Sequence, residues 1–345
     1  MGTEPEIAVI IGAYRREEFL DRAIDSVLHQ TLPRAAVEIQ VVTDFDASSW
    51  RTRYGTEGIE FARDSERSIG RWLLAAARRT RAPLVAFLDD DDEFEPARLA
   101  EAVAIFRTHP EIGLYHNRIL PIDTEDRPLS EARWGPEDRD PTLERTGAAL
   151  VPAGSRTGLA PYLTEDGSVA FSASTMIVRR DLLDGPPGDA FGLTNLPDFA
   201  LVVLAVTHPS ALYLDPRRFT RYRRHAANAS DRTGQLRIAV DGHATLAAVA
   251  RARGRDDLAD WLERFSVHYD RILRGETVVN GIRGRVPRSR VASEALGYLQ
   301  FLGRHPAERA ARLDVWSAPL YAAGYLALPG LAYRIAAARP TARRN

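Results

Sequence analysis

The stretch PLVAFLDDDDEFEP, residues 83–96, carries four consecutive aspartates directly behind an apolar run. A short continuous apolar run of this kind is typical of a strand buried in a parallel sheet. The carboxylates of Asp89 to Asp92 repel one another, so a buried strand end that carries them needs a positive partner. A divalent cation such as Mg²⁺ would serve, because carboxylates and substrate phosphates commonly hold it together. The alternative is a solvated acidic turn beside the N-terminus of the next helix.

The chain as a whole has an ordinary globular composition. Its 345 residues suffice for one large domain with a smaller addition, and 45% of them are hydrophobic. A formal net charge of -1 gives no argument for a nucleic-acid partner. The absence of cysteine excludes disulfides, thiolate metal sites and a cysteine nucleophile. The first residues lack the long apolar stretch of a secretory signal, so we expect a cytoplasmic protein.

The first half of the chain alternates between two hydrophobic periods. Apolar runs predict strands at residues 7–11, 37–46 and 83–88, and helical spacing predicts helices at residues 16–31, 68–81 and 96–109. This alternation predicts an α/β fold with a Rossmann-like, mostly parallel sheet and helices on both faces. Ligands of such sheets bind outside the carboxyl ends of the strands. We therefore expect Gly12, Asp44 and the four aspartates to converge on one crevice.

The second half is less regular. Residues 120–168 are rich in Pro, Gly, Asp and Arg and predict loops and short elements. A strand followed by a helix is expected over residues 169–183, and an apolar helix over residues 197–208. From about residue 235 the pattern is helical and rich in alanine. We predict a first domain over residues 1–234 and a helical region over residues 235–345.

Four segments resemble, in the same order, the motifs of family-two glycosyltransferases, which are inverting enzymes of the GT-A fold. They are IAVIIGAYRREEFLDRAIDSVLHQT, VVTDFD, AFLDDDDEFEPARL and FTRYRRHAANAS, and together they cover roughly residues 6–232. The third contains the Asp-x-Asp (DXD) signature. The resemblance implies transfer of a sugar from a nucleoside-diphosphate sugar with the help of Mg²⁺ or Mn²⁺. UDP is the favoured nucleotide, with GDP and dTDP open, and the acceptor is a glycan, a lipid-linked molecule or a small molecule.

The resemblance also implies that residues at the strand ends contact the nucleotide and the sugar of the donor. These residues are Ala13, Tyr14, Asp44, Asp89 and Asp90. Tyr14 would lie beside the base, and Asp44 would accept a hydrogen bond from it. Structural alternatives are an aromatic side chain packed at a strand end and an aspartate that caps a turn. Ala13 stands where the family usually has Thr, which leaves the nucleotide preference open.

For the metal and the diphosphate, the resemblance implies three further residues. Asp91 would be the direct metal ligand, and His225 would help to hold the metal or the diphosphate. Arg223 is one of three arginines around His225, and this arrangement suits a diphosphate. The alternative for His225 is a structural or surface role.

The transfer also requires a base for the acceptor hydroxyl, and a carboxylate can provide it. In the family this base usually lies in a Glu-Asp pair at a helix start. NLPDFALVVL places Asp198 there, with Pro197 in place of the Glu. The alternative is that Asp198 only caps the helix.

Residues 315–333 contain no charged residue, although prolines and glycines interrupt the stretch. A membrane-spanning helix needs about 20 mostly apolar residues, so a true span stays open as a third interpretation beside the two that follow. The main interpretation is a helix that packs on the first domain or on a second copy. The second is contact of residues 314–345 with the inner face of the membrane, as a peripheral protein, supported by tyrosines and by the arginines that follow.

Two other functions remain open from the sequence. A nucleotidyltransferase would use a related sheet, but GAYRREEF has little glycine for a phosphate loop. A non-catalytic nucleotide-sugar binding or scaffold protein would not depend on Asp198. A glycosidase would not need the nucleotide crevice, and a Mg²⁺-dependent phosphatase would need a lysine, which this chain lacks.

Overall fold

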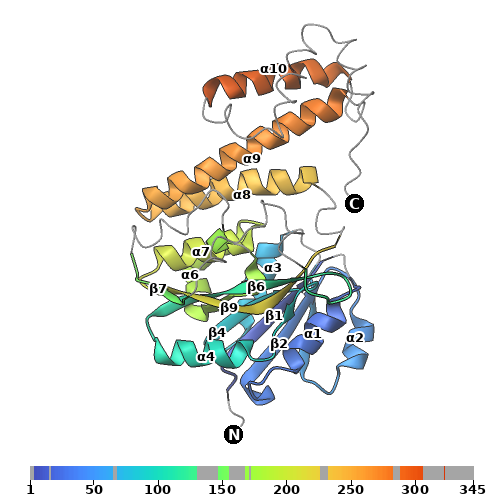
Figure 1. Cartoon of the computed structure of the whole chain (residues 1–345), viewed down its shortest axis with the longest axis vertical. Coiled ribbons are helices and arrows are strands. Elements are labelled where there is room, and N and C mark those ends of the chain that lie inside the picture. Colours follow the sequence, from blue (N-terminus) through green and yellow to red (C-terminus); the bar gives the residue numbers. More distant parts are fainter. Residues whose placement is uncertain are drawn as a thin grey trace. The chain divides into compact units, whose positions relative to one another are not determined.

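The computed structural model describes residues 4–14, 17–64, 68–129, 147–154, 168–170, 172–225, 232–282, 288–305 and 322 (Figure 1). Its contacts divide the chain into two compact units, residues 1–230 with 242–262, and residues 231–241 with 263–345. The first unit therefore takes in residues 242–262, whereas the sequence predicts a single boundary after residue 234.

The described strands of the first unit form one nine-stranded mixed sheet. Its first half is parallel, in the order β3 (Ile59–Arg63), β2 (Val37–Thr43), β1 (Ile7–Ala13) and β4 (Leu84–Asp89). Its second half continues with β8 (Met176–Arg179), β6 (Ile112–Ile122), β9 (Ala211–Arg223) and β5 (Glu93–Phe94), while β7 (Ala149–Val151) also pairs with β9. Here only β6 and β9 are parallel to each other. The predicted parallel order thus holds for the first half of the sheet.

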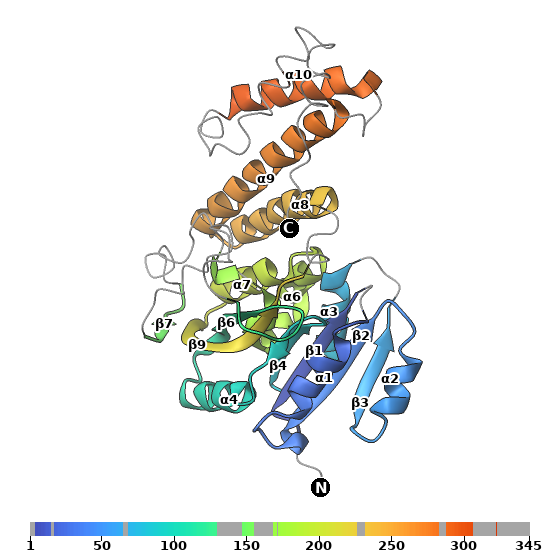
Figure 2. The same cartoon turned by 45° about the vertical axis from the view of Figure 1, so that its right-hand side comes forward.

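Helices cover both faces of the sheet, as predicted (Figures 1 and 2). One face carries α1 (Leu20–Leu28), α2 (Ser48–Arg53) and α4 (Arg98–Thr108). The other carries α3 (Ile69–Arg79), α6 (Gly185–Gly192) and α7 (Pro197–Thr207). Strands with helices on both sides are buried on both sides, which explains why β1 and β4 are continuous apolar runs.

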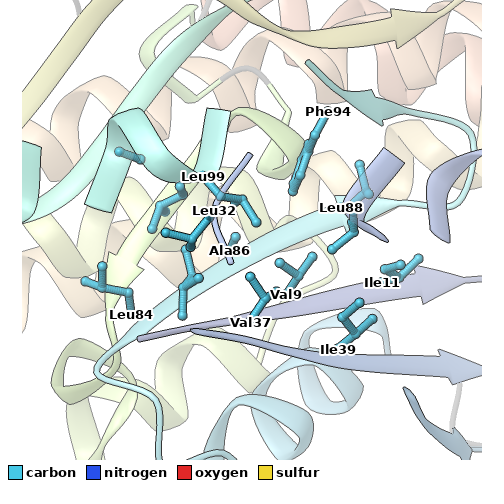
Figure 3. Close-up of a cluster of buried hydrophobic side chains, with 14 of the residues drawn as sticks. Val9, Ile11, Leu32, Val37, Ile39, Leu84, Ala86, Leu88, Phe94 and Leu99 are labelled. Carbon is cyan, nitrogen blue, oxygen red and sulfur yellow. The ribbon is translucent and has the colours of Figure 1, made fainter. Parts of the chain in front are cut away.

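The core beneath α1 and α4 is built from alternate residues of the central strands (Figure 3). Val9 and Ile11 of β1 lie beside Ala86 and Leu88 of β4, and all four are buried. The intervening residue Phe87 points to the opposite face, because successive side chains of a strand alternate. These buried strands form a rigid base for the residues that follow them.

On the opposite face, α3 and the segment before α7 are tightly packed. The Phe87 ring of β4 lies 5.6 Å from the Phe191 ring of α6. A Cβ atom on Gly70 would lie 2.2 Å from the Thr194 carbonyl oxygen and 2.4 Å from that of Phe191. The side chain of Asn195 accepts a hydrogen bond of 2.9 Å from the Ile69 N–H at the start of α3. The N-terminus of α3 therefore fixes the chain that leads into α7.

Several elements differ from the sequence prediction. The strand β6 and the pair α2 and β3 were not predicted. The helix expected at the end of residues 169–183 is only a short 3₁₀ turn, Arg180–Leu183, after β8. Residues 210–225 form the long strand β9, which carries the basic stretch.

The C-terminal region is helical, as predicted, with α8 (Arg232–Ala252), α9 (Asp256–Ile282) and α10 (Arg288–Arg304). In the second unit, Val278 of α9 and Val291 and Tyr298 of α10 belong to a small core that also includes Ala322. Among the described helices, none combines the length and the hydropathy needed to cross a membrane. The segment 314–345, for which membrane contact is predicted, lies outside the described residues except for Ala322.

Candidate active site

The carboxyl ends of β1, β2 and β4 lie at one edge of the sheet. Gly12 pairs with Asp89, and Ala13 pairs with Thr43, so the residues that follow these strands share that edge. Asp44 comes directly after β2 and is half-buried. Tyr14 comes directly after β1, and its ring lies 5.6 Å from the ring of Trp72 in α3. The strand register therefore brings together the residues that the sequence assigns to the nucleotide.

Three carboxylates of the acidic run form a compact cluster. Oxygen atoms of Asp89, Asp91 and Asp92 all lie within 4.8 Å of one another. Asp91 and Asp92 are buried, and burial together with the charges of Asp91 and Asp89 raises the pKa of Asp92 well above its usual value. Carboxylate oxygens at this spacing fit a hard divalent cation, which would relieve their repulsion. Asp92 has no role in the sequence prediction. Asp90, for which the resemblance implies contact with the donor, is buried but lies outside this group.

His225 completes one side of the cluster. Its Nε2 atom lies 3.0 Å from Oδ2 of Asp91, and both side chains are less than 10% exposed, at 7% and 6%. The ring of Phe19, just before α1, lies 5.2 Å from the imidazole ring. Asp91 and His225, predicted as a pair of metal ligands, are thus neighbours in the fold.

Arg223, at the end of β9, lies behind the acidic run and is fully buried. Its N–H donates to Oδ1 of Asp92, and its Nε donates to the Asp91 carbonyl oxygen, both at 3.0 Å. The two remaining guanidinium nitrogens donate to Glu93 and to the turn that contains Asp126. Although burial opposes it, the hydrogen bond from Arg223 lowers the pKa of Asp126. These protein contacts differ from the diphosphate contact predicted for Arg223.

A series of hydrogen bonds between buried polar residues leads from the end of β4, at the acidic run, to β6 and β9. The Ser174 hydroxyl accepts a hydrogen bond of 3.0 Å from the Asp89 N–H. The Ser174 carbonyl oxygen accepts one from Thr220, which in turn accepts one from the side chain of Asn117. Asn117 accepts a hydrogen bond of 2.8 Å from the buried side chain of Arg98, whose pKa burial lowers to about 9. Strands β6 and β9 thereby fix the end of β4.

Asp198 lies in the first turn of α7 and is half-buried. Its Oδ1 accepts a hydrogen bond of 2.9 Å from the Phe199 N–H. Burial raises the pKa of Asp198 to about 6, against backbone hydrogen bonds from Phe199, Asp198 itself and Ser172. Ser172 has a positive φ of 57° and precedes Ser174, which contacts the end of β4. One short segment, residues 172–174, therefore touches both Asp198 and the acidic run.

The comparison with known families agrees with this geometry. Residues 8–157 match the family described as glycosyl transferase family 2. This part of the chain holds β1, β4 and the acidic run, so the match includes three of the four motifs from which the sequence predicts the family.

The chain is also similar to an uncharacterized glycosyltransferase of Nostoc sp. (strain PCC 7120), with 33% identity over 155 residues. That stretch is 42% of this chain and 47% of the relative, so the chain spans about half the length of the curated relative.

The fold is similar to crystal structures of residues 1–349 of TarS from S. aureus. The complex with UDP-GlcNAc matches with a TM-score of 0.57 and 14% identity, over 96% of this chain and 87% of that one. The complex with UDP matches with a TM-score of 0.54 and 13% identity, over 93% and 90%. At this identity the likeness shows the fold, which is the predicted GT-A architecture with a helical C-terminal region.

Proposed function

We propose that this protein is a metal-dependent inverting glycosyltransferase that moves a sugar from a nucleoside-diphosphate sugar to an acceptor hydroxyl. The observation that carries the proposal is the cluster of Asp89, Asp91 and Asp92, closed by His225, within a family-two segment. Mg²⁺ or Mn²⁺ fits this oxygen-rich set of ligands.

We propose a UDP-sugar as the donor. The proposal is supported by the TarS structures of the same fold, which contain UDP-GlcNAc and UDP. Ala13, Tyr14 and Asp44 would bind the base at the ends of β1 and β2, and Asp89 with Asp90 would contact the ribose and the sugar. The Asp91 and His225 side chains would hold the cation, which neutralises the charge of the leaving diphosphate when bound.

Asp198 is the proposed general base. Its carboxylate would take the proton of the acceptor hydroxyl as the hydroxyl oxygen forms a bond to the anomeric carbon. The bond from that carbon to the diphosphate oxygen breaks, and the diphosphate leaves with the electron pair. Attack from the face opposite the diphosphate inverts the anomeric centre. With a pKa of about 6, most Asp198 side chains are ionised at neutral pH and can act as a base.

The second candidate is a non-catalytic nucleotide-sugar binding protein. It is supported by Pro197, which stands where the family usually has an acid beside the base. The acceptor remains a prediction, as do the cytoplasmic location and the contact of residues 314–345 with a membrane surface.

Calorimetric titration with UDP, GDP and dTDP, each with and without Mn²⁺, tests the proposal. We expect metal-dependent binding that is strongest for UDP, followed by transfer from a UDP-sugar to added acceptors. Metal-dependent binding without transfer to any acceptor would favour the binding protein. The absence of binding for all three nucleotides would contradict both.

A further inference from the structure

We infer that Arg223 is a positioning residue, which holds the turn of Asp91 and Asp92 in the shape that binds the cation and is itself held by Asp126. The inference rests on the proposed function, because it concerns the same cation site. It assigns to Arg223 a contact with the protein in place of a contact with the donor, and it gives Asp126 a role that the sequence does not indicate.

The contacts of Arg223 join two segments of the chain. On the acidic run, its N–H and Nε bind the Asp92 carboxylate and the Asp91 carbonyl oxygen. On the turn after β6, its Nη1 donates to the Asp123 carbonyl oxygen at 2.8 Å and to Oδ1 of Asp126 at 2.5 Å. Both the backbone and the side chain of Arg223 therefore fix atoms of the acidic run.

The turn that contains Asp126 is held from several sides. Arg22 of α1 donates to Oδ1 of Asp126 and to the Thr124 carbonyl oxygen, both at 2.9 Å. Arg221 of β9 donates to the Asp126 carbonyl oxygen at 2.8 Å. Asp126 has a positive φ of 65°, a left-handed conformation that aspartate adopts more readily than most residues and that suits a tight turn. The turn thus offers Arg223 a fixed carboxylate.

The charges explain why an arginine is needed behind the cluster. Asp91, Asp92 and Glu93 are consecutive acids, and Asp126 brings a further carboxylate to the same guanidinium group. One guanidinium group within hydrogen-bonding distance of Glu93 and Asp126 offsets part of this repulsion. A planar group with five donors can bind acceptors on two segments at once, which a lysine ammonium cannot do with the same geometry.

Phe19 links this arrangement to the other metal ligand. The guanidinium carbon of Arg223 lies 4.7 Å from the centre of the Phe19 ring, and His225 packs on the same ring at 5.2 Å. A shift of Arg223 would therefore disturb the backbone of Asp91 and the packing of His225 together. Groups behind the direct ligands of a metal commonly orient those ligands in this way.

The test measures Mn²⁺ affinity by electron paramagnetic resonance of the free ion, with Mn²⁺ alone and with Mn²⁺ plus UDP, on the full chain. R223K keeps the positive charge but loses the planar guanidinium group with its several donors, and we expect Mn²⁺ affinity to fall roughly tenfold. D126N removes the negative charge that faces Arg223 at a half-exposed position but keeps Oδ1 as an acceptor, and we expect a fall of about threefold. The control E125Q removes a charge from the same turn, where Glu125 contacts Thr124 and Arg127. Its affinity should stay unchanged.

The outcomes separate this inference from the proposed function. Unchanged Mn²⁺ affinity in D126N would show that the Asp126 carboxylate does not hold Arg223 in place. An equal fall in D126N and E125Q would show that only the charge of the turn matters. Either result would overturn the inference. If R223K does not fold, D126N and E125Q decide alone, with melting temperatures to show that both are folded. If the unmodified chain binds no Mn²⁺ with or without UDP, the metal site itself fails, and the inference fails with it.

Discussion

The imidazole of His225 lies 3.0 Å from the carboxylate of Asp91, although 134 positions separate the two residues in the chain. One residue follows the parallel half of the sheet and the other follows β9, at its opposite half. The fold thus brings a carboxylate oxygen and an imidazole nitrogen to one point, beside the carboxylates of Asp89 and Asp92. We predict that this point is the cation site.

The variant D91N, which keeps the shape of the side chain but removes its charge, tests the cation site. We expect UDP affinity in the presence of Mn²⁺ to fall roughly 10- to 100-fold, as for the loss of a group that holds or orients a metal. Affinity without metal should stay the same, because the base and ribose contacts remain. Calorimetry with and without Mn²⁺ measures both. The matched control is D181N, at an exposed aspartate in the 3₁₀ turn after β8. Equal Mn²⁺ dependence in D91N and the unmodified chain would contradict the assignment of Asp91.

The variant D198N tests the general base. We expect donor binding to persist and the turnover number to fall by about 10² to 10⁴, which is the usual contribution of a positioned base. The measurement is a transfer assay combined with calorimetry of UDP in the presence of Mn²⁺. D184N serves as control, since Asp184 forms an ion pair with Arg180 outside the site. Turnover within twofold of the unmodified chain would remove Asp198 from this role.

The parts predicted correctly from the sequence are those with a local signal. β1, β2 and β4 are buried on both faces, so their apolar runs are visible without knowledge of the fold. β6 was missed because it contains His116 and Asn117, which are polar yet buried. Asn117 is satisfied by Arg98 and Thr220, which lie far from it in the chain. Polar residues of this kind look like a loop until their distant partners are known.

In the candidate site too, the residues with a local sequence signal were predicted, and those that depend on distant partners were missed. Asp91 and His225 belong to motifs with a recognisable order, so the sequence indicates both. Asp126 lies in no motif, and its role depends on Arg22, Arg221 and Arg223, which come from two other elements. The resemblance assigns Arg223 to the diphosphate, because arginines beside His225 suit that group, whereas the fold buries it among carboxylates of the protein.

The pH dependence of transfer follows from the pKa of Asp198. Burial raises this pKa to about 6, and only the ionised carboxylate can accept a proton. The turnover number should therefore fall about tenfold for each pH unit below 6 and level off above it. A rate profile between pH 4.5 and pH 8 measures this, at saturating donor and metal. A profile without a step near pH 6 in the unmodified chain would contradict the assignment, provided the protein is folded over this range.

The raised pKa of Asp198 also predicts a change in stability with pH. Transfer should rise as the pH increases through 6, whereas the stability of the folded chain should fall. A folded-state pKa of about 6, against 3.8 for the ordinary carboxyl, means that the folded chain holds the proton more tightly. The cost of the buried charge is absent below pH 4 and fully present above pH 6. A shift of about 2 units corresponds to at most about 3 kcal/mol. D198N should thus raise the melting temperature at pH 7.5 and leave it unchanged at pH 3.5. If D198N and the unmodified chain had equal melting temperatures at pH 7.5 as well as at pH 3.5, burial would not raise the pKa of Asp198.

Gly70 provides the last prediction, because the start of α3 packs directly on the chain before α7. A Cβ atom at this position would lie 2.2 Å and 2.4 Å from the carbonyl oxygens of Thr194 and Phe191, which belong to the backbone and cannot rotate away. G70A should lower the free energy of unfolding by about 1–3 kcal/mol, the usual cost of overpacking. It should also slow transfer, because the displaced segment leads directly to Asp198. Urea unfolding and the transfer assay measure the two effects.

The matched control is G297A in α10, where a Cβ atom would meet nothing within 4 Å. A glycine inside a helix costs roughly 0.5–1 kcal/mol relative to alanine, so this variant should be slightly more stable and should transfer normally. A loss of stability in both variants would mean that the close approach at Gly70 is not the cause. If G70A were less stable but transferred normally, the packing of α3 would not determine the position of Asp198. The segment before α7 could then shift without moving the carboxylate.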